Sequence, residues 1–257
     1  GCRLPAREEP RADILGNQGA LGHLELTFAS YNIHKAVGLD RRRDPDRIIA
    51  VLNELDADVV ALQEVDRRLG RRESVLPLAH LEDYTPYHPV PLNHRPHSLG
   101  WHGNALLVKR HIKVVEAGVV PLPVIEPRGA IRADLMVGGK RLRVVGMHLD
   151  LSGLRRRQQV RAVLAHIERC GHSCPTVAMG DCNEWGTRRG ALSEFHAPWR
   201  VLAPGLSFPS RRPLAALDRI VVSEHWQVAA MDVHHSALSA RASDHLPVRA
   251  RLTLHKI

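Results

Sequence analysis

The chain has 257 residues, of which 44% are hydrophobic and 25% charged, and this composition suits one large globular domain with a sizeable core. No segment has the length of a transmembrane helix, and no fixed-period repeat or low-complexity tract is present, which argues against a membrane-spanning helix and a repeat architecture in these residues. The formal net charge is +9, and 31 of the 36 basic residues are arginine, which favours phosphate and carboxylate groups. An anionic partner therefore fits; the alternative is that the arginines are simply spread over solvated faces.

The four cysteines have neither zinc-binding spacing nor a clear disulfide pattern. They are Cys2, Cys170, Cys174 and Cys182. Cys170 and Cys174 are near enough in sequence to form a bridge, but buried free thiols are expected instead.

The N-terminal part of the chain is polar and lacks sustained periodicity. We predict a flexible lead-in at residues 1–22 and a single domain at residues 23–257, which we expect to be a monomer with no obligate protein partner. The chain begins Gly1-Cys2 without a methionine, so we expect a trimmed start. A cytoplasmic location is favoured, with a processed exported or lipid-anchored form as the alternative.

The first predicted elements alternate between strand and helix. Residues 24–31 have the apolar–polar alternation of a strand and lead into Asn32. Asp44 and Pro45 then open an amphipathic helix that extends to Leu55. Residues 58–65 form a second apolar strand, which carries a charge near its end. Strand, helix and strand at this spacing indicate a layered α/β protein.

The rest of the chain is predicted to be richer in strands. Apolar residues do not recur at regular spacing in residues 66–103, which are predicted to be helix fragments within a long loop. Further strands are predicted at residues 104–108, 114–119, 129–137, 140–148, 175–179, 217–222, 226–233 and from about 248 to 254. A helix is predicted at residues 153–169 and a polar helix-like piece at 189–196. Because Gly138-Gly139 joins two strands as a hairpin turn, we expect mixed or antiparallel sheets.

Polar side chains that suit metal or phosphate chemistry stand at the ends of six strands. They are Asn32, Glu64, His148, the Asp181/Asn183 pair, Asp218 and the Asp244/His245 pair. Each has a plain alternative, such as a turn residue, a surface carboxylate, an interior histidine or, for Asp218, a salt bridge with Arg219. Because the strands of one core bring their ends to a common rim, we expect these residues to meet. Such a rim, without zinc-binding spacing, favours the hard cation Mg²⁺, or alternatively Mn²⁺.

The stretch after the strand at 175–179 carries the most chemistry, because Gly180 is followed by Asp181 and Asn183. Strand alternation would place Asp181 and Asn183 on the same side of an extended chain. Asp181 can bind a metal or accept a proton from water, and Asn183 can bind water or an oxyanion. The alternative is that they cap a helix beginning near Arg188. Cys182, between them, is expected to be a buried structural thiol.

Six short motifs, in their order along the chain, resemble the motif set of the endonuclease/exonuclease/phosphatase (DNase I-like) superfamily. They are Ser-Tyr-Asn-Ile-His at Asn32, Leu-Gln-Glu-Val at Glu64, Gly-Met-His-Leu at His148, Gly-Asp-Cys-Asn at Asp181, Leu-Asp-Arg-Ile at Asp218 and Ser-Asp-His-Leu-Pro-Val at His245. The match spans about residues 24–254 and is greatest to small bacterial members of unassigned substrate. The resemblance implies an α/β fold, a four-layer α/β/β/α sandwich in which two mixed, mostly antiparallel sheets pack face to face with helices outside.

The resemblance also implies roles for the acidic and amide residues. Glu64 resembles the principal metal ligand of the family, supported by Asn32 and Asp244. Asp181 resembles the group that orients or deprotonates the attacking water. Asn183 resembles a residue that holds the phosphate or the nucleophile.

Further roles concern the two histidines. Asp218 resembles the carboxylate that pairs with His245, fixes its tautomer and favours its charged form. His148 resembles a second histidine that contacts phosphate or protonates the leaving oxygen. In deoxyribonuclease a glutamate pairs with that histidine, whereas Asn104 is found near the corresponding strand here.

Three residues are candidates for binding substrate. Arg128 resembles a phosphate-clamping arginine, and Asn104 and His34 belong to shorter motifs shared with the small bacterial members. Together these assignments predict Mg²⁺-dependent hydrolysis of a phosphoester, and of a diester in preference to a monoester.

Three functional hypotheses remain open from sequence. A nuclease suits the net charge and the five arginines Arg67, Arg68, Arg71, Arg72 and Arg95, although 4% aromatic residues leave few platforms for base stacking. A phosphatase or phosphodiesterase acting on phospholipid headgroups or small phosphorylated molecules would use the basic surface at an anionic membrane, with Leu99 and Trp101 in a suitable loop. The third is a catalytically inactive module that binds an anionic ligand.

Overall fold

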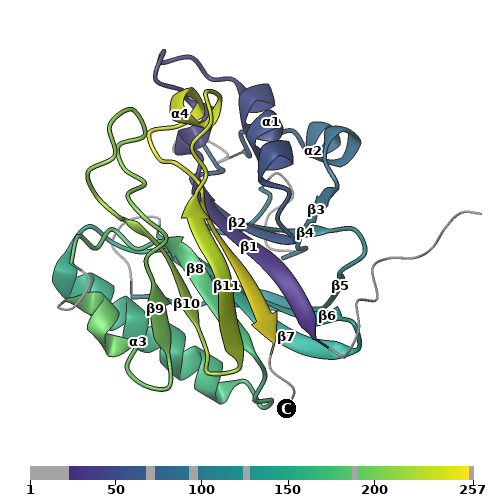
Figure 1. Cartoon of the computed structure of the whole chain (residues 1–257), viewed down its shortest axis with the longest axis vertical. Coiled ribbons are helices and arrows are strands. Elements are labelled where there is room, and N and C mark those ends of the chain that lie inside the picture. The colour runs from purple at the N-terminus through teal and green to yellow at the C-terminus, as the bar shows by residue number, and fades with distance from the viewer. Residues whose placement is uncertain (1–22, 68–72, 93–97, 124–127, 187–189, 255–257) are drawn as a thin grey trace, which may run out of the picture.

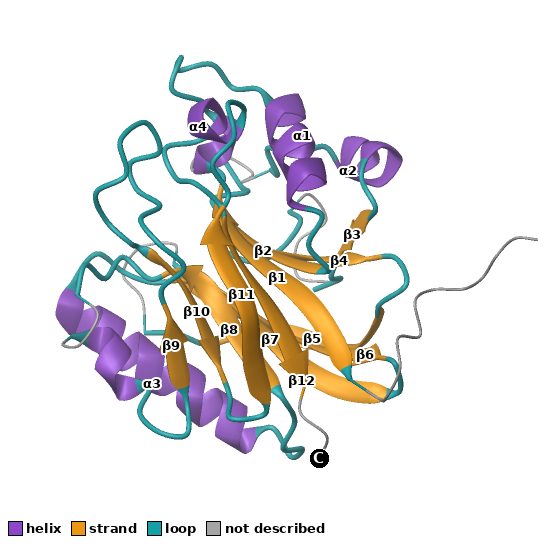
Figure 2. Cartoon of the chain, in the orientation of Figure 1, coloured by secondary structure: helices purple, strands orange, loops and turns teal. Residues whose placement is uncertain are grey.

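Two six-stranded sheets packed face to face form the centre of the molecule, with helices on the outer faces (Figures 1 and 2). The computed structural model describes residues 23–67, 73–92, 98–123, 128–186 and 190–254. The predicted lead-in at residues 1–22 therefore lies outside the described residues.

The first sheet has the strand order β11–β12–β1–β2–β4–β3. Its strands are β1 (Leu24–Asn32), β2 (Val59–Gln63), β3 (Tyr87–Pro89), β4 (Ala105–Lys109), β11 (Trp226–Val233) and β12 (Val248–Leu254). Among these strands only β1 and β2 pair in parallel, so both deliver their C-terminal ends to the same edge.

The second sheet has the order β5–β6–β7–β8–β10–β9. Its strands are β5 (Lys113–Val120), β6 (Gly129–Val137), β7 (Lys140–His148), β8 (Thr176–Asp181), β9 (Arg200–Leu202) and β10 (Asp218–Val222). Here β7 and β8 are the parallel pair, and the register sets His148 beside Asp181. The predicted mixed, mostly antiparallel sandwich is confirmed.

Helices cover the two outer faces of the sandwich (Figure 2). On the first sheet lie α1 (Pro45–Leu55) and α2 (Leu78–Tyr84), and on the second lies α3 (Gly153–Arg169). The shorter pieces are α4 (Ser239–Ala242) and the 3₁₀ turns η1 (His34–Ala36) and η2 (Ala191–Glu194). None of the described helices is both long and apolar enough to cross a membrane.

Three apolar clusters separate the four layers. The central one is shared by both sheets and contains Phe28 and Trp226, whose rings meet edge to face at 5.4 Å, together with Met179 from the second sheet. A second cluster lies under α1, and a third lies between the second sheet and α3. Burying both faces of each sheet in this way explains the continuous apolar runs of the central strands.

Local sequence signals account for most elements. Asp44 caps α1 by accepting a hydrogen bond from the Arg47 amide at 3.2 Å, and Pro45 occupies the first turn, where its missing N–H is not needed. The short strands β3 and β9 and the single turn α4 were not predicted, because three or four residues carry too little periodicity.

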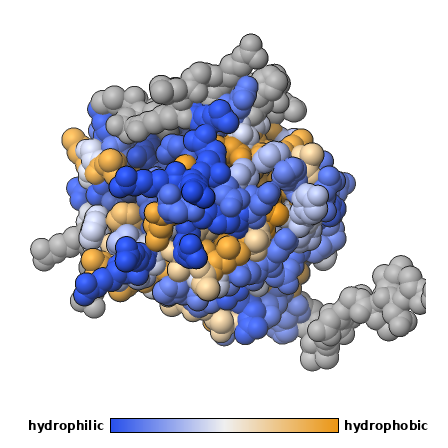
Figure 3. All heavy atoms as spheres, turned by 90° about the horizontal axis from the view of Figure 1, so that it is seen from above, coloured by the Kyte–Doolittle hydropathy of each residue, from blue (hydrophilic) through white to orange (hydrophobic). Residues whose placement is uncertain are grey.

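The cysteines and the surface add two further observations. Cys174 and Cys182 are buried and free, as expected, whereas Cys170 is free but only partly buried; Cys2 lies outside the described residues. The face that carries α1 and α4 is largely hydrophilic, with apolar residues scattered over it (Figure 3).

Candidate active site

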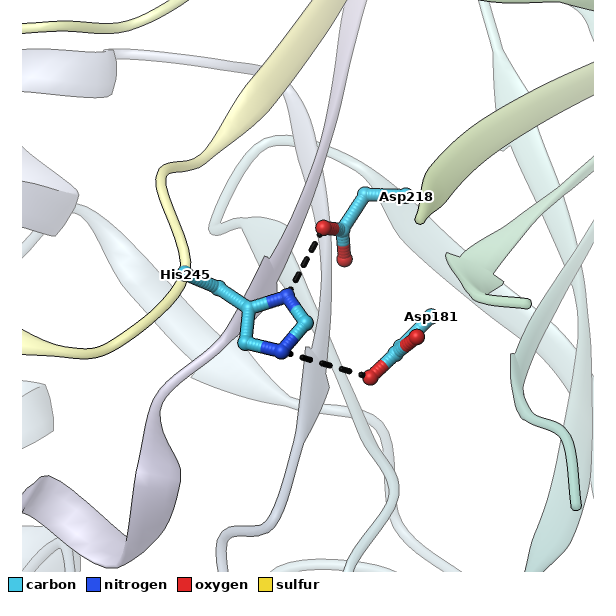
Figure 4. Close-up of side chains that lie close together, drawn as sticks. All are labelled: Asp181, Asp218 and His245. Carbon is cyan, nitrogen blue, oxygen red and sulfur yellow. Dashed lines mark hydrogen bonds and ion pairs between the residues drawn. The ribbon is translucent and has the colours of Figure 1, made fainter. Parts of the chain in front are cut away.

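The ring of His245 lies between two carboxylates that come from neighbouring strands (Figure 4). Asp181 ends β8 and Asp218 begins β10, and the antiparallel register sets them opposite each other. His245 Nδ1 is 2.8 Å from Asp218 Oδ2, and His245 Nε2 is 3.7 Å from Asp181 Oδ2. Ser207 Oγ donates to the same Asp218 oxygen at 2.6 Å, so this carboxylate is held from two sides. All four residues are buried.

Asp181 also contacts residues at two other strand ends and in the loop that follows its own strand. Its Oδ2 accepts a hydrogen bond from Asn32 Nδ2 at 2.9 Å and lies 3.4 Å from His148 Nε2. Its Oδ1 accepts from the Asn183 amide at 3.0 Å. The rim predicted from sequence therefore exists, and Asp181 is its meeting point.

Glu64 joins this rim through Asn32. The Asn32 amide donates to Glu64 Oε1 at 3.3 Å, in addition to its bond with Asp181. The Lys35 ammonium forms an ion pair with Glu64 Oε2. Glu64 follows β2 and has a φ of 58°, a left-handed conformation that costs a non-glycine residue energy and is typical of functional positions.

The charges of these groups stabilise one another. Burial favours the neutral form of Asp181, but the hydrogen bond and charge of His148, the charge of His245 and the Asn32 amide reverse this and hold the pKa of Asp181 well below its usual range. Burial opposes ionisation of Glu64 as well, yet the charge of His148 and the Lys35 ion pair lower its pKa to about 2. Both carboxylates are therefore ionised at neutral pH.

His245 is shifted in the opposite direction. Burial alone would lower its pKa, but the charge and hydrogen bond of Asp218, with the charges of Asp181 and Asp244, raise it to about 10. The predicted pairing of Asp218 and His245 is thus present in the geometry. The alternative salt bridge of Asp218 with Arg219 is absent, because no nitrogen of the buried Arg219 guanidinium has a hydrogen-bond partner among the residues that the structure describes.

Gly180 is required by the close approach of β7 and β8. A Cβ atom at this position would lie 1.7 Å from the Met147 carbonyl oxygen, so no side chain fits. The glycine before Asp181 is therefore a packing requirement that brings Asp181 next to His148 on the adjacent strand.

Contrary to the expectation from strand alternation, the extended backbone of β8 does not continue to Asn183. Strand β8 ends at Asp181, and Asn183 has a left-handed φ of 48°. Its side-chain amide donates to the Leu149 carbonyl at 2.8 Å, which ties the loops after β7 and β8 together. Nor do the two residues cap a described helix: Arg188 lies outside the described residues, and the next turn, η2, has Gly190 at its N-cap.

Four further predicted residues lie around this centre. The Arg128 guanidinium contacts the ring of His148, with Nη1 at 3.1 Å from Nδ1. Asn104 is buried, and its Oδ1 has no hydrogen-bond partner within the described part of the chain. His34 is partly exposed, 3.9 Å from Asp244 Oδ1, and its backbone amide donates to Asn32 Oδ1 at 3.0 Å. The substrate-binding roles of Arg128, Asn104 and His34, and the ligand role of Asp244, stay predictions.

Two groups are candidates for holding a metal ion. Within the described part of the chain, the cluster of His, Cys, Asp or Glu side chains close enough to share an ion is Asp181, Asp218 and His245. Because both His245 ring nitrogens face carboxylates, an ion there would displace a proton from the ring. The predicted group around Glu64 offers carboxylate and amide oxygens instead, and the Lys35 ammonium already places a positive charge against Glu64.

Several contacts of the rim were missed by sequence reasoning. The Lys35 ion pair depends on the left-handed η1 turn, and Ser243 Oγ donates to the Asn32 carbonyl at 2.7 Å from a distant loop. The Phe208 ring packs against His245 with ring centres 4.9 Å apart. Nothing in the pattern of the Ser207-Phe208-Pro209 segment indicates that it reaches Asp218 and His245.

A buried ion pair supports the loops that carry Asn183. Glu184 Oε2 lies 3.3 Å from Arg156 Nη2 and accepts the Ala191 amide at 3.0 Å, and both charged side chains are about one-tenth exposed. Replacing Glu184 by Ala leaves a buried guanidinium uncompensated, so we expect the free energy of unfolding to fall by about 3–5 kcal/mol. Urea denaturation measures this loss.

The matched control is Glu194→Ala, which removes a carboxylate from an ion pair with the exposed Arg161. Exposed ion pairs contribute little, so we expect a much smaller loss than in Glu184→Ala. Equal losses in the two variants would show that the Arg156–Glu184 pair does not support these loops.

Comparison with known protein families identifies the family to which this chain belongs. Residues 29–245, which include most of the two sheets and every residue of the rim, match the Endonuclease/Exonuclease/phosphatase family. The chain belongs to this family. Its members are phosphoester hydrolases that typically depend on a metal ion, and the predicted family membership is thereby confirmed.

Solved structures of this family share the fold at low sequence identity. An endonuclease/exonuclease/phosphatase from Bacteroides vulgatus aligns with a TM-score of 0.70 and 17% identity over 90% of this chain and 100% of its own. D. rerio TDP2 complexed with a single-strand DNA product aligns with a TM-score of 0.69 and 16% sequence identity, over 89% of this chain and 98% of its own. A Bacteroides thetaiotaomicron mannosyl-6-phosphatase aligns with a TM-score of 0.67 and 20% sequence identity, over 88% of this chain and 99% of its own. A search of curated proteins found no match.

Proposed function

We propose that the protein is a Mg²⁺-dependent phosphodiesterase that hydrolyses its substrate by in-line attack of a water molecule. The observation that carries this proposal is the Asp218–His245–Asp181 arrangement, in which a charged imidazole and an ionised carboxylate face the same space. Phosphoester hydrolysis depends on positioning and charge neutralisation, and such a pair provides both.

Each side chain of the rim has a defined task in this mechanism. Asp181 Oδ1 accepts one hydrogen bond, from Asn183, which leaves a lone pair that can orient the attacking water and accept its proton. The His245 imidazolium, held by Asp218, donates to a phosphate oxygen and stabilises the charge that develops there. Arg128, against His148, adds a further positive group for the phosphate.

The residues near Glu64 fit a hard divalent cation. Glu64 is ionised and shares the Asn32 amide with Asp181, so two carboxylates converge there. The Lys35 ammonium beside Glu64 supports a cation at this place. When bound, Mg²⁺ would polarise the phosphate oxygens and neutralise their charge. Glu64 and Asn32 would hold it, and Asp244 is the further predicted ligand.

Removal of the metal tests this assignment. We expect EDTA to abolish hydrolysis and Mg²⁺ to restore it, with Mn²⁺ as a substitute. Glu64→Gln keeps the size but loses the charge, so the Mg²⁺ concentration for half-maximal rate should rise at least about tenfold. Glu168→Gln, on the exposed face of α3, should leave it unchanged. An unchanged Mg²⁺ requirement in Glu64→Gln would remove Glu64 from the metal site.

A screen of substrates defines the activity. Aryl monoester, aryl diester, DNA, RNA and phospholipid are each incubated with Mg²⁺, with Asp181→Asn as the inactive control. Nicking of plasmid DNA that falls steeply from low to physiological salt supports a nucleic-acid substrate. Binding of nucleic acid without metal-dependent hydrolysis of any ester supports the inactive binding module.

One observation favours a phosphodiesterase or phosphatase acting on phospholipid headgroups as the second candidate. Leu151 and Trp185, in the loops after β7 and β8, have 66% and 68% of their surface exposed, and Leu154, in the first turn of α3, has 71%. They flank the loop that carries Asn183, and exposed apolar side chains beside a site suit an apolar surface. Hydrolysis of a soluble aryl diester that is accelerated by anionic vesicles supports this candidate.

A further inference from the structure

A second polar pocket lies on the outer face of the second sheet, at the C-terminal end of α3. Its volume is about 300 Å³, and its lining includes four arginines and two carboxylates. They are Arg132, Arg141, Arg143, Arg169, Glu116 and Asp134. The pairing of β6 with β7 sets Gly129 opposite His148 and Asp134 opposite Arg143, so the pocket lies five residues along the strands, roughly 16 Å, from the rim.

The pocket carries an excess of positive charge. Asp134 is fully buried and accepts two bonds of 2.8 and 3.0 Å from Arg143, one of 2.7 Å from Arg141 and a longer one of 3.4 Å from Arg132. Glu116 is shared between Arg132 and Arg141 and is half exposed. Arg169 forms no ion pair with any described residue. Two carboxylates therefore face four guanidinium groups in this pocket.

Two buried side-chain nitrogens in the pocket have no hydrogen-bond partner among the described residues. The Arg132 side chain is only 8% exposed, and its Nε–H lacks a hydrogen-bond partner among the described residues. His166 Nε2 is likewise buried and unpaired. A buried donor without an acceptor is costly, so this vacancy suits a ligand that brings acceptor oxygens.

The electrostatic environment of His166 agrees with this charge balance. Burial lowers the pKa of His166, and the charges of Arg132, Arg169 and Arg143 lower it further. A neighbouring pocket of about 410 Å³ shares Arg141 and His172 and adds Lys140. The positive region thus continues into a space large enough for the organic part of a small molecule.

We propose that this pocket is a second, non-catalytic binding site for the phosphate group of a small phosphorylated molecule or for free phosphate. A dianionic tetrahedral group offers acceptors to the unpaired Arg132 and His166 nitrogens and balances the excess charge, and arginine is the side chain best suited to it. The proposal is independent of the reaction at the catalytic rim.

An NMR titration with inorganic phosphate, in EDTA and with wild-type protein, tests the site. We expect saturable shifts of the Gly171 and His172 amides, because both residues line the pocket. Signals near Asn183 report any phosphate at the catalytic rim separately, so Asp181→Asn should bind phosphate at the pocket like the wild type. Failure of the proposed hydrolase activity would leave this readout intact.

Two variants of opposite expected sign separate a binding site from a structural ion-pair network. Arg169→Ala removes an unpaired charge and should weaken phosphate binding about tenfold. Glu116→Gln removes the competing carboxylate and should strengthen it about threefold. Arg161→Ala, on the same helix but outside the pocket, should have no effect. Absence of saturable shifts at Gly171 and His172, or equal affinities in Arg169→Ala and Glu116→Gln, would overturn the proposal.

The same titration distinguishes the two sources of the phosphate group. If glycerol 3-phosphate binds at least about threefold more tightly than inorganic phosphate, the neighbouring pocket holds the organic part of a phosphomonoester. If the two bind equally, free phosphate is the ligand. Either result retains the site.

Discussion

Replacing Asp181 by Asn should lower the turnover of whichever phosphoester the protein hydrolyses by at least about a hundredfold. The substitution keeps the shape of the side chain, and its oxygen can still accept from the Asn183 amide. It removes the charge, however, and an amide cannot take a proton from the attacking water. The measurement is the initial rate at saturating substrate and Mg²⁺.

The contacts of Asp181 predict how the loss divides between binding and chemistry. Asp181 lies between Asn32, His148 and His245 rather than on an exposed surface, so its loss should reduce kcat far more than it raises KM. Near-UV circular dichroism confirms that the variant is folded. Asp232→Asn is the matched control, because it removes a carboxylate from the exposed pair with Arg249. Its rate should stay within about twofold of wild type. A wild-type rate in Asp181→Asn would rule out the role proposed for Asp181.

The elements with strong periodicity could be predicted from the sequence to the residue. The hairpin strands β6 and β7 and the helix α3 have the bounds expected, because alternation, a Gly-Gly turn and a 17-residue helix are local signals. The prediction of a four-layer sandwich came from the resemblance of six motifs to a known family, because the pattern of a single strand does not determine how two sheets pack. Pairing between β1 and β12, more than two hundred residues apart, is an example of what local patterns do not contain.

The rim itself was predicted because strand ends of one core converge, but its internal contacts were not. Extended alternation failed at Asn183, where a left-handed residue turns the amide toward Leu149. Lys35 and Ser207 reach Glu64 and Asp218 from loops whose path is set by tertiary packing. The second polar pocket could not be predicted from the sequence either, because Arg132 and Arg143 become neighbours of Arg169 only when α3 packs on β6 and β7.

Replacing Asp218 by Asn should move the titration of His245 strongly toward lower pH. In the wild type the pKa of His245 is raised to about 10, against burial, by Asp218 and then by Asp181 and Asp244. Loss of one adjacent negative charge should lower this pKa by about 1–3 units. The pKa can be followed by NMR of ¹³C-labelled histidine in EDTA. Glu54→Gln is the control, since it removes the carboxylate that pairs with another histidine, His234, at 2.7 Å.

The same shift predicts how activity and stability depend on pH. If His245 acts as the imidazolium, the alkaline limb of the wild-type rate profile lies near pH 10 and moves downward in Asp218→Asn. Because the folded-state pKa is above the unfolded value, about 6.5, protonated His245 stabilises the fold fully below that pH. This contribution is lost as pH rises through about 10. In Asp218→Asn the pKa of folded His245 is lower, so this stabilisation should be lost at a lower pH than in the wild type. A His245 that still titrates near 10 in this variant would show that Asp218 does not hold its proton.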